Sequence, residues 1–445
     1  MVSKKVFFWS IVVALGGFLF GFDTAVISGA ERAVQELWQL NVFEHGLTVA
    51  IALIGTVVGS LTGGIPSDKF GRKNTLFGIA VLYLLSAIGT ALAPDWITFL
   101  IFRFLGGVGV GVSSVAAPLY ISEISPAKSR GKLVALFQFN IVFGILIAYL
   151  SNYLFAGTGE HDWRWMLGVQ AFPSLVFLVA ILFVPESPRW LLLYCTGKEE
   201  EAKKTLEIAN PGADAGEMVT DILVSAHNAE TDGKRASLFS KKYSLPITLA
   251  VLFAFFNQVS GINAIIYYAP RIFEMVGLGQ DSALLSSAGI GLVNFLFTLL
   301  AMNVIDRFGR RTLMLIGSIG LILTLGLVAK AFYLQEFNSM TVPIYLFVYI
   351  AFFAFSQGAV IWVFISEIFP NQVRASGQAL GSFTHWIMAA AIAFSFPYIS
   401  ETLGGGNTFM IFTGMMVLQL LFVWRLMPET KGSSLENIEQ KVVYH

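Results

Sequence analysis

Twelve apolar stretches, each about twenty residues long, constrain this chain more than any other feature. A helix that crosses the hydrocarbon core of a bilayer needs about 20 such residues. Apolar residues make up 56% of the 445-residue chain and charged residues only 13%, against about 25% charged in soluble domains. The sequence therefore predicts an all-α polytopic membrane protein with twelve transmembrane helices and largely excludes soluble enzymes. The stretches lie near residues 7–29, 47–67, 74–93, 97–119, 133–154, 165–185, 245–269, 283–304, 312–333, 342–365, 376–398 and 407–427.

A charged segment between the sixth and seventh stretches divides the chain. Residues 186–244 are rich in Lys and Glu and include a break at Asn210-Pro211-Gly212, so we expect short cytoplasmic helices here. The predicted organisation is an N-terminal six-helix bundle (1–185), this linker (186–244), a C-terminal six-helix bundle (245–430) and a short cytoplasmic tail (431–445).

Three short motifs occur in both halves, in the same order and about 240 residues apart. Their shared order and spacing predict a duplicated six-helix unit. The pairs are Asp68-Lys-Phe-Gly-Arg-Lys73 with Asp306-Arg-Phe-Gly-Arg-Arg311, Ser122-Glu-Ile-Ser-Pro126 with Ser366-Glu-Ile-Phe-Pro370, and Pro185-Glu-Ser-Pro-Arg189 with Pro428-Glu-Thr-Lys431.

Positive charges predict the orientation. With an even number of spans both termini lie on one side, and most of the 28 Lys and Arg residues fall in segments on that side. Because positively charged loops stay in the cytoplasm, we expect both termini there, in an inner or plasma membrane. The short basic start leads directly into the first span, which argues against a cleaved signal peptide.

The repeated motifs place acidic and basic residues at matching positions. Glu123 and Arg130 are seven residues apart, as are Glu367 and Arg374, so both members of a pair can face one partner across about two helical turns. We expect an ion-pair latch that holds the cytoplasmic side closed; the alternative is that these charges only anchor loops at the lipid headgroups. The candidate gating charges are Asp68, Arg72, Glu123, Arg130, Glu186, Arg189, Asp306, Arg310, Glu367, Arg374 and Glu429.

Together with Pro185-Glu-Ser-Pro-Arg-Trp-Leu191, Gln258-Val-Ser-Gly-Ile-Asn-Ala264 and Pro428-Glu-Thr-Lys-Gly432, the paired loops resemble the sugar porter family of the major facilitator superfamily. The resemblance covers nearly the whole chain and implies two six-helix bundles around a central sugar site that opens alternately to each side. The expected partners are a small sugar, protons and the lipid bilayer, and the short tail and lack of extra domains permit a functional monomer. No cofactor is expected, because the transmembrane proton gradient would supply the energy.

Charge and cysteine content exclude other classes of partner. Acidic and basic residues are equal in number, which argues against nucleic acid. Cys195 is the single cysteine and no Cys/His cluster accompanies it, so no metal site is expected.

Two ionisable residues within the predicted spans are functional candidates, because such groups are costly in a membrane. Asp23 lies in the first span and Arg103 in the fourth. Burial favours the neutral form of a carboxyl while a nearby arginine favours the charged form, so such a pair can carry a proton. Asp23 also resembles the carboxylate of proton-coupled family members, which favours proton:sugar symport. The alternative is a facilitative uniporter in which Asp23 is structural.

Uncharged polar and aromatic side chains within the spans suit sugar hydroxyls and the apolar face of a sugar ring. Singly, each is more typical of helix packing; their collective match to the family favours sugar binding. The polar run around Gly261 predicts a broken seventh helix, which is tolerated where it lines a cavity. The hydrogen-bonding candidates are Gln138, Asn257, Gln258, Asn263, Tyr267 and Asn294, and Trp362, His385 and Trp386 add stacking surface and donors. By resemblance, Gln138, Gln258, Asn263, Asn294 and Trp362 match sugar-contacting positions, while Phe20, Tyr267, Gly358 and Trp386 line or gate the site.

Two positions depart from the family pattern. Asn257 stands where a glutamine is usual, and His385 stands where an amide usually precedes Trp386. Both changes are expected to alter which sugar is preferred. The other histidines, His45, His161, His227 and His445, are expected to lie in loops or the tail and to carry no signal. The glycine-rich stretch 106–111 lies in an apolar span and indicates close helix packing, not a phosphate loop.

The sequence as a whole predicts a proton-coupled monosaccharide symporter for a hexose or pentose, working by alternating access, and not an enzyme. A nontransporting membrane sugar sensor is the alternative from another class. Such a receptor would carry a long signalling tail, whereas only about 18 residues follow the last predicted span.

Overall fold

The computed structural model describes residues 3–126, 129–231, 238–335, 340–370 and 372–431, and within these ranges the secondary structure is helical, without a strand. Eleven helices of this described part are long and apolar enough to cross a membrane. The last, α18 (Arg374–Arg425), is 52 residues long and leaves helical geometry at Gly404 (φ 77°, ψ 162°). It therefore carries two spans, and the all-α polytopic fold with twelve spans is confirmed.

The described residues pack into two compact units that cut across several helices. The first holds Met1–Thr24, Ile54–Ile145 and Arg164–Lys234, and the second holds Ala25–Leu53, Leu146–Trp163 and Arg235–His445, in so far as these residues are described. Because these boundaries follow packing, the division at residues 186 and 245 stays a prediction. Of the predicted tail 431–445, only Lys431 lies within the described residues.

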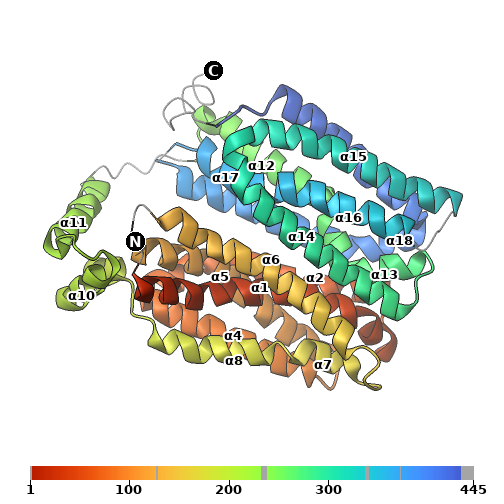
Figure 1. Cartoon of the computed structure of the whole chain (residues 1–445), viewed down its shortest axis with the longest axis horizontal. Coiled ribbons are helices and arrows are strands. Elements are labelled where there is room, and N and C mark those ends of the chain that lie inside the picture. The colour runs from red at the N-terminus through yellow and green to blue at the C-terminus, as the bar shows by residue number, and fades with distance from the viewer. Residues whose placement is uncertain (1–2, 127–128, 232–237, 336–339, 371, 432–445) are drawn as a thin grey trace. The chain divides into compact units, whose positions relative to one another are not determined.

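Long helices of the first unit run side by side (Figure 1), and α4 packs along both α5 and α8. α5 also approaches α2 so closely that a Cβ on Gly111 would lie 2.3 Å from the Thr56 carbonyl oxygen, which confirms the packing role of the glycine-rich stretch. The helices are α1 (Lys4–Leu37), α2 (Val42–Thr62), α3 (Gly64–Phe70), α4 (Arg72–Ala91), α5 (Trp96–Ile124), α6 (Arg130–Phe155), α7 (Asp162–Gly168) and α8 (Ala171–Ala180), which a 3₁₀ turn extends to Phe183. Of these, α1, α2, α6 and α7 continue into the second unit.

Short helices form in the linker, as predicted. They are α9 (Pro188–Tyr194), α10 (Glu199–Ala209) and α11 (Ala215–Thr231). Ser187 caps α9 by accepting a hydrogen bond from the Trp190 backbone N–H, and Pro188 occupies the first helical position, where its missing N–H costs nothing. α10 and α11 share a small core of Leu206, Ala215 and Val219.

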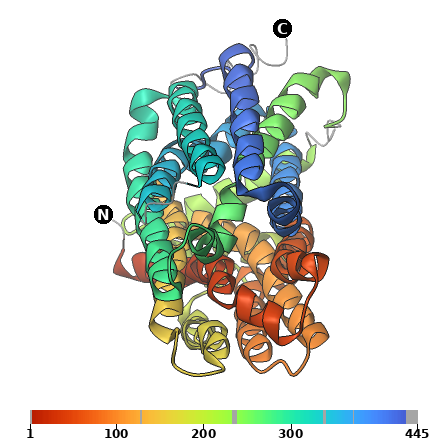
Figure 2. The same ribbon diagram turned by 90° about the vertical axis from the view of Figure 1, so that its right-hand side faces the viewer.

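The second unit contains the remaining helices, several of which are seen close to end-on in Figure 2. α18 packs along α12 and α15. The predicted break in the seventh span is present: α12 ends at Val259, α13 begins at Ile262, and Gly261 between them has a left-handed backbone (φ 85°). The helices are α12 (Ser244–Val259), α13 (Ile262–Met275), α14 (Gln280–Phe308), α15 (Arg310–Leu334), α16 (Thr341–Phe353), a π-helical segment (Ala354–Gly358), α17 (Ala359–Ile368) and α18.

The first span is longer than its apolar stretch and the second begins earlier than its own, and this corrects one expectation. α1 continues to Leu37 and α2 begins at Val42, so His45 lies in a helix and not in a loop. Its side chain is fully buried and pairs with Glu31. Charged residues ended the apolar stretch at residue 29, but the apolar period of Ile27, Ala30 and Val34, all buried, carries the helix further.

Candidate functional site

The two ionisable residues of the spans meet inside the first unit. Arg103 of α5 donates a hydrogen bond of 2.8 Å from Nη1 to Oδ1 of Asp23 on α1, and a longer one of 3.3 Å from Nη2 to the Asp23 carbonyl oxygen. The side chains are 2% and 3% exposed. Nε of Arg103 is buried and has no hydrogen-bond partner among the described residues. Asp23 is therefore the principal counter-charge of a desolvated guanidinium.

Gly106, about one turn after Arg103, lets α5 pack closely against α4 beside this pair. A Cβ at Gly106 would lie 2.3 Å from Oγ of Ser86 and 3.5 Å from Oδ1 of Asp23. Phe20, one turn before Asp23 on α1, is buried, and Gln138 on α6 is half-buried. Phe20 and Gln138 belong to the first unit, whereas the other predicted sugar-binding residues belong to the second.

A chain of side-chain hydrogen bonds is centred on Gln258 at the end of α12. Its Nε2 donates to Oδ1 of Asn257 at 2.8 Å, and its Oε1 accepts from Nδ2 of Asn263 at 2.6 Å across the helix break. The same Nε2 lies 3.2 Å from Nδ1 of His385 on α18. Asn257 and His385, the two departures from the family pattern, thus contact one amide. Nδ2 of Asn257 is buried and has no partner among the described residues.

Aromatic rings flank this polar group. The ring centroids of Trp362 on α17 and His385 are 4.9 Å apart, and Trp386 meets His385 edge-on with a centroid distance of 4.8 Å. Trp386 is buried, but Trp362 is 37% exposed, so part of its indole face is available for stacking on a ligand. Tyr267 on α13 and Asn294 on α14 are buried in the same unit.

Gly358 ends a π-helical segment, which the sequence did not predict. The segment spans Ala354–Gly358 and is followed directly by α17, which carries Trp362. π-Helical turns are rare and frequent at functional sites. Here the extra residue in the turn changes the direction in which α17 presents its side chains.

The repeated charges form one network within the first unit. Arg72 makes a bidentate contact with Glu123, with Nε and Nη2 each 3.0 Å from a carboxylate oxygen, and its Nη1 donates to Oδ1 of Asp68 at 3.1 Å. Glu186 accepts hydrogen bonds from the backbone N–H groups of Arg72 and Lys73 at 2.9 and 3.1 Å. Burial raises the pKa of Glu186, although these N–H groups oppose the shift.

The second unit repeats this network. Nη2 of Arg310 donates to Glu367 at 2.8 Å and Nη1 to Asp306 at 2.9 Å. Glu429 accepts from the backbone N–H groups of Arg310 and Arg311 at 2.9 and 3.0 Å. The sequence repeat is therefore also a repeat of side-chain contacts.

The glycines of the two repeated turns serve these networks. Gly71 and Gly309 have φ values of 93° and 87°, a region that favours glycine. A Cβ would lie 2.3 Å from Oε2 of Glu186 at Gly71 and 2.6 Å from Oε2 of Glu429 at Gly309. Each glycine thus makes room for the carboxylate that caps the next helix.

Three of the predicted gating residues lie apart from these networks. Arg130 and Arg189 are exposed. Nε of Arg374 donates to the Phe369 carbonyl oxygen at 3.2 Å, and its Nη2 has no partner among the described residues. The sequence predicted the charged groups, but not which arginine pairs with which glutamate.

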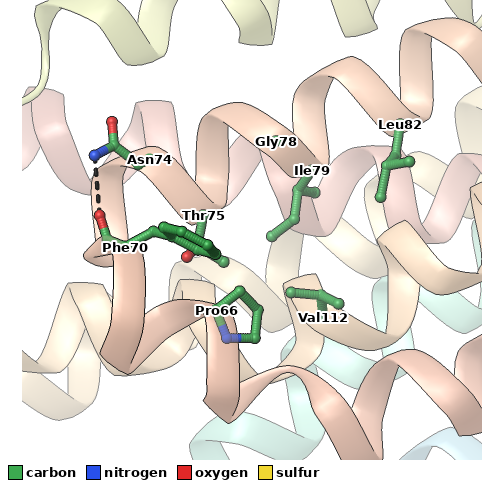
Figure 3. Close-up of a pocket in the computed structure, with 8 residues that line it drawn as sticks. All are labelled: Pro66, Phe70, Asn74, Thr75, Gly78, Ile79, Leu82 and Val112. Carbon is green, nitrogen blue, oxygen red and sulfur yellow. Dashed lines mark hydrogen bonds between the residues drawn. The ribbon is translucent and has the colours of Figure 1, made fainter.

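A pocket of about 530 Å³ lies among α3, α4 and α5 of the first unit (Figure 3). Figure 3 shows mainly carbon atoms facing it, with Asn74 bonded back to the Phe70 carbonyl oxygen. An apolar lining does not suit sugar hydroxyls, and none of the predicted sugar-binding residues takes part. Its lining residues are Pro66, Phe70, Asn74, Thr75, Gly78, Ile79, Leu82 and Val112.

Within the described part of the chain, no group of three or more His, Cys, Asp or Glu side chains is placed to hold a metal ion.

Sequence reasoning missed a further group of ionisable residues, in which the buried Glu31 and His45 meet the half-buried Arg271. The available signal was the apolar period that continues α1 beyond residue 29.

Comparisons with known proteins agree with this arrangement. A family model described as "Sugar (and other) transporter" matches residues 9–442. The D-xylose-proton symporter of Escherichia coli (strain K12) is 36% identical over 475 residues, covering 98% of this chain and 96% of that protein. The arabinose-proton symporter of Bacillus subtilis (strain 168) is 38% identical over 437 residues, covering 97% of this chain and 94% of that protein.

A solved structure of a related transporter has the same fold. The inward open conformation of the xylose transporter XylE from E. coli matches with a TM-score of 0.87 and 34% identity, covering 98% of this chain and 100% of that one. The matched family model, the two relatives and this structure each cover almost the whole chain. The chain therefore belongs to the sugar transporter family of the major facilitator superfamily, and it is a multi-pass membrane transporter and not an enzyme.

Proposed function

We propose that this transporter is a proton-coupled symporter for a monosaccharide, a pentose or hexose, and that it works by alternating access. The buried Asp23–Arg103 pair carries the proposal. A carboxylate that has a single guanidinium as its main partner is stable in two forms, charged and paired or neutral and released. The names of the xylose and arabinose relatives, both proton symporters, support this reading of Asp23.

The proposed cycle begins with Asp23 protonated from the outer solution. The neutral carboxyl no longer attracts Arg103, which keeps only its longer hydrogen bond to the Asp23 backbone. The contact between α1 and α5 is thereby weakened, and sugar binds. When the inner side opens, sugar leaves, the proton passes to the cytoplasm, and the Asp23–Arg103 pair forms again.

Gln258 and Asn263 would bind sugar hydroxyls, and the exposed part of Trp362 would stack on the sugar ring. His385 contacts Gln258 and so sets the direction of its amide. The further proposed binding residues are Phe20, Gln138, Asn257, Tyr267, Asn294, Gly358 and Trp386.

The repeated Arg–Glu networks would stabilise the cytoplasmic ends of the helices, and the proposed latch uses the same charges. Arg72–Glu123 and Arg310–Glu367 pair within their own units. Arg130 and Arg374, whose guanidinium groups are not taken up by these pairs, are the groups that would change partner as the cytoplasmic side opens and closes. We place both termini in the cytoplasm and the protein in a cell membrane, as a functional monomer that uses the proton gradient and no cofactor.

The uniporter alternative keeps Asp23 as a permanent structural charge, and the sensor alternative removes transport altogether. Uptake of labelled xylose, arabinose and glucose into proteoliposomes, with and without an inward proton gradient, separates the three. We expect accumulation above equilibrium only with the gradient. In Asp23→Asn we expect accumulation to be lost while exchange continues, whereas Asp95→Asn, at the exposed N-cap of α5, should behave like the wild type.

Equilibration that ignores the gradient would make the protein a facilitator, and the absence of any uptake would favour the sensor. Accumulation that survives in Asp23→Asn would remove Asp23 from the coupling mechanism.

A further inference from the structure

A second group of buried ionisable side chains lies where α1 ends and α2 begins. Glu31 is on the last turns of α1 and His45 on the first turn of α2, and their side chains are 2% and 0% exposed. Both belong to the second unit, together with α13 and α18. The transport cycle proposed above uses neither residue.

His45 contacts two groups of opposite charge through one nitrogen. Its Nε2 lies 2.7 Å from Oε2 of Glu31 and 3.2 Å from Nη1 of Arg271 on α13. Arg271 also lies 3.4 Å from the same Glu31 oxygen, donates to Gln35 at 2.9 Å, and reaches Glu401 of α18 at 3.3 Å. A single guanidinium thus connects α1 and α2 to α13 and α18.

The distance between His45 and Glu31 requires a proton between them. Two lone pairs 2.7 Å apart repel, whereas an N–H···O hydrogen bond has this length when charge assists it. We therefore assign the proton of the neutral imidazole to Nε2, which donates to Oε2 of Glu31. The 3.2 Å approach of Arg271 Nη1 to the same nitrogen is then a contact and not a hydrogen bond. Nδ1 of His45 is buried and has no partner among the described residues, so it is the position that accepts a second proton.

A second proton changes the balance of charge around Arg271. With neutral imidazole, Glu31 and Arg271 form a neutral pair. With imidazolium, two cations 3.2 Å apart share the one buried carboxylate, Glu31, and like charges at this distance repel strongly in a buried site. Protonation of His45 therefore weakens the hold of Glu31 on Arg271.

The other titratable groups around His45 do not offset this repulsion directly. Tyr268 of α13 packs its ring against the imidazole with centroids 5.9 Å apart. Glu401 reaches only Arg271, on its far side. On α2 itself, Glu44 caps the helix by accepting from the Asn41 N–H, and nearer the surface Arg32 pairs with Glu36 and Glu274.

Beside this cluster, α2 packs closely against α18 and α6 packs against α13. We call this line of contacts, between α1, α2 and α6 on one side and α13 and α18 on the other, the seam, and it is closed in this structure. A Cβ at Gly46, next to His45, would lie 2.3 Å from the Phe394 carbonyl oxygen of α18. Tyr149 at the end of α6 donates to the Ile266 carbonyl oxygen of α13 at 2.5 Å. This side of the second unit opens only if α1, α2 and α6 separate from α13 and α18.

We propose that His45 and Glu31 form a second protonation site, separate from Asp23 and Arg103, which controls opening of the side opposite the chain termini. At neutral pH, Arg271 stays paired with Glu31 and the seam is closed. In acid solution His45 binds a proton at Nδ1, Arg271 leaves Glu31, and α2 separates from α18. Arg271 is 22% exposed, so water and protons can reach the cluster from this side.

The direction of the effect rests on the proposed transport function. If the termini are cytoplasmic, this side faces the outer solution, and acid there opens the transporter when a proton is available for Asp23. The proton bound by His45 comes from the outer solution and returns to it when the seam closes. The site therefore changes the rate of transport and not the number of protons moved per sugar.

A labelling experiment on the full chain tests the site without measuring transport. Cys195 is the single cysteine, so Cys195→Ser removes the background, and Ser400→Cys places a thiol on a buried position of α18 next to Glu401. A membrane-impermeant maleimide is added outside at pH 8 and at pH 5, in this parent and with His45→Gln. The ratio of the two labelling rates at each pH cancels the intrinsic pH dependence of the thiol.

We expect the labelling rate of the parent divided by that of His45→Gln to be roughly 5- to 150-fold higher at pH 5 than at pH 8. This is the usual range for coupling between two sites. His161→Gln, an exposed histidine, should label like the parent at both pH values. An equal ratio at both pH values would overturn the proposal.

Two further measurements keep the result interpretable. Arg271→Gln should label rapidly at both pH values because the link to Glu31 is absent; slow, pH-dependent labelling in this variant would also overturn the proposal, even if His45→Gln does not fold. The unfolding midpoint of each purified variant in detergent shows which variants are folded. Absent sugar uptake with pH-dependent labelling would contradict the transport function alone, and intact uptake with pH-independent labelling would contradict this site alone.

Discussion

Arg103 donates a 2.8 Å hydrogen bond to Asp23 in surroundings that leave neither side chain more than 3% exposed. Each charge is therefore stabilised mainly by the other, because water does not reach them. Removing one member leaves a buried charge without compensation, which is costly, whereas removing both is often tolerated. This asymmetry distinguishes a coupled pair from two independent polar residues.

We predict that Asp23→Asn and Arg103→Gln each lower the free energy of unfolding by about 3–5 kcal/mol, and that the double variant loses less than either single variant. Thermal unfolding of the purified variants in detergent measures this. Additive losses in the double variant would show that the pair is not coupled.

Arg72→Lys and Arg310→Lys should destabilise the protein to a similar extent, by about 1–3 kcal/mol each. Lysine cannot reproduce the simultaneous contacts of Arg72 with Glu123 and Asp68, or those of Arg310 with Glu367 and Asp306. Unfolding midpoints report the loss. Arg189→Lys, at an exposed position, is the control and should change little; a clear effect in only one of the two repeats would argue against their equivalence.

His385→Asn should change which sugar is preferred. The shorter side chain withdraws from Nε2 of Gln258, now 3.2 Å from the ring, and leaves that amide free to turn. One hydrogen bond is worth about 1 kcal/mol, so we expect roughly a fivefold change in the ratio of KM values for xylose and glucose. Thr384→Ser, which retains the hydroxyl that bonds to the Leu380 carbonyl oxygen, should leave the ratio unchanged.

Gly261→Ala should damage the protein at the break of the seventh span. Gly261 has φ of 85°, and its Cβ would lie 2.7 Å from the Phe412 ring, so we expect a loss of at least about 1–2 kcal/mol from backbone strain alone. Gly414→Ala is the matched control, because a Cβ there meets nothing within 4 Å. Unfolding midpoints and sugar exchange should fall in the first variant and not in the second.

The effect of Glu186 should depend on pH. Burial raises its pKa above the usual 4.5, so the folded protein holds this proton at pH values where the unfolded chain has lost it. Its contribution to stability is then greatest at low pH and is lost as pH rises from about 4.5 through the raised pKa. The unfolding midpoint of the wild type minus that of Glu186→Gln should therefore fall as the pH is raised from 4 to 7. A difference that stays constant over this range would contradict the prediction.

The sequence was sufficient for the number of spans and for the broken seventh helix. Both features depend only on neighbouring residues. An apolar stretch of span length is enough to predict a membrane helix, and the polar run around Gly261 is enough to predict a break. The meeting of Asp23 with Arg103 was also predictable, because a charge in a span needs a partner and few candidates exist.

Other features depend on contacts that local patterns do not contain. The pairing of Arg72 with Glu123, while Arg130 stays exposed, is set by how helices from distant parts of the chain pack. The burial of His45 was missed because the charges near it in the sequence indicated a loop. In the structure, contacts with Glu31 and Arg271 stabilise these charged groups where the helices pack. The π-helical turn before Trp362 could not be predicted, because its span is predominantly apolar and the pattern of apolar residues does not indicate the turn.

The C-terminal ends of α1 and α6 and the N-terminal half of α2 pack in the second unit, and this sets an order of events during synthesis. These helices enter the membrane first, but Gly46 fits against Phe394, and Tyr149 bonds to Ile266, on segments translated much later. Until α13 has been inserted, the Glu31–His45 pair lacks Arg271 and the Tyr149 hydroxyl lacks its acceptor on Ile266. The parts of these helices that belong to the first unit can pack earlier, whereas the parts that belong to the second unit complete folding only near the end of translation.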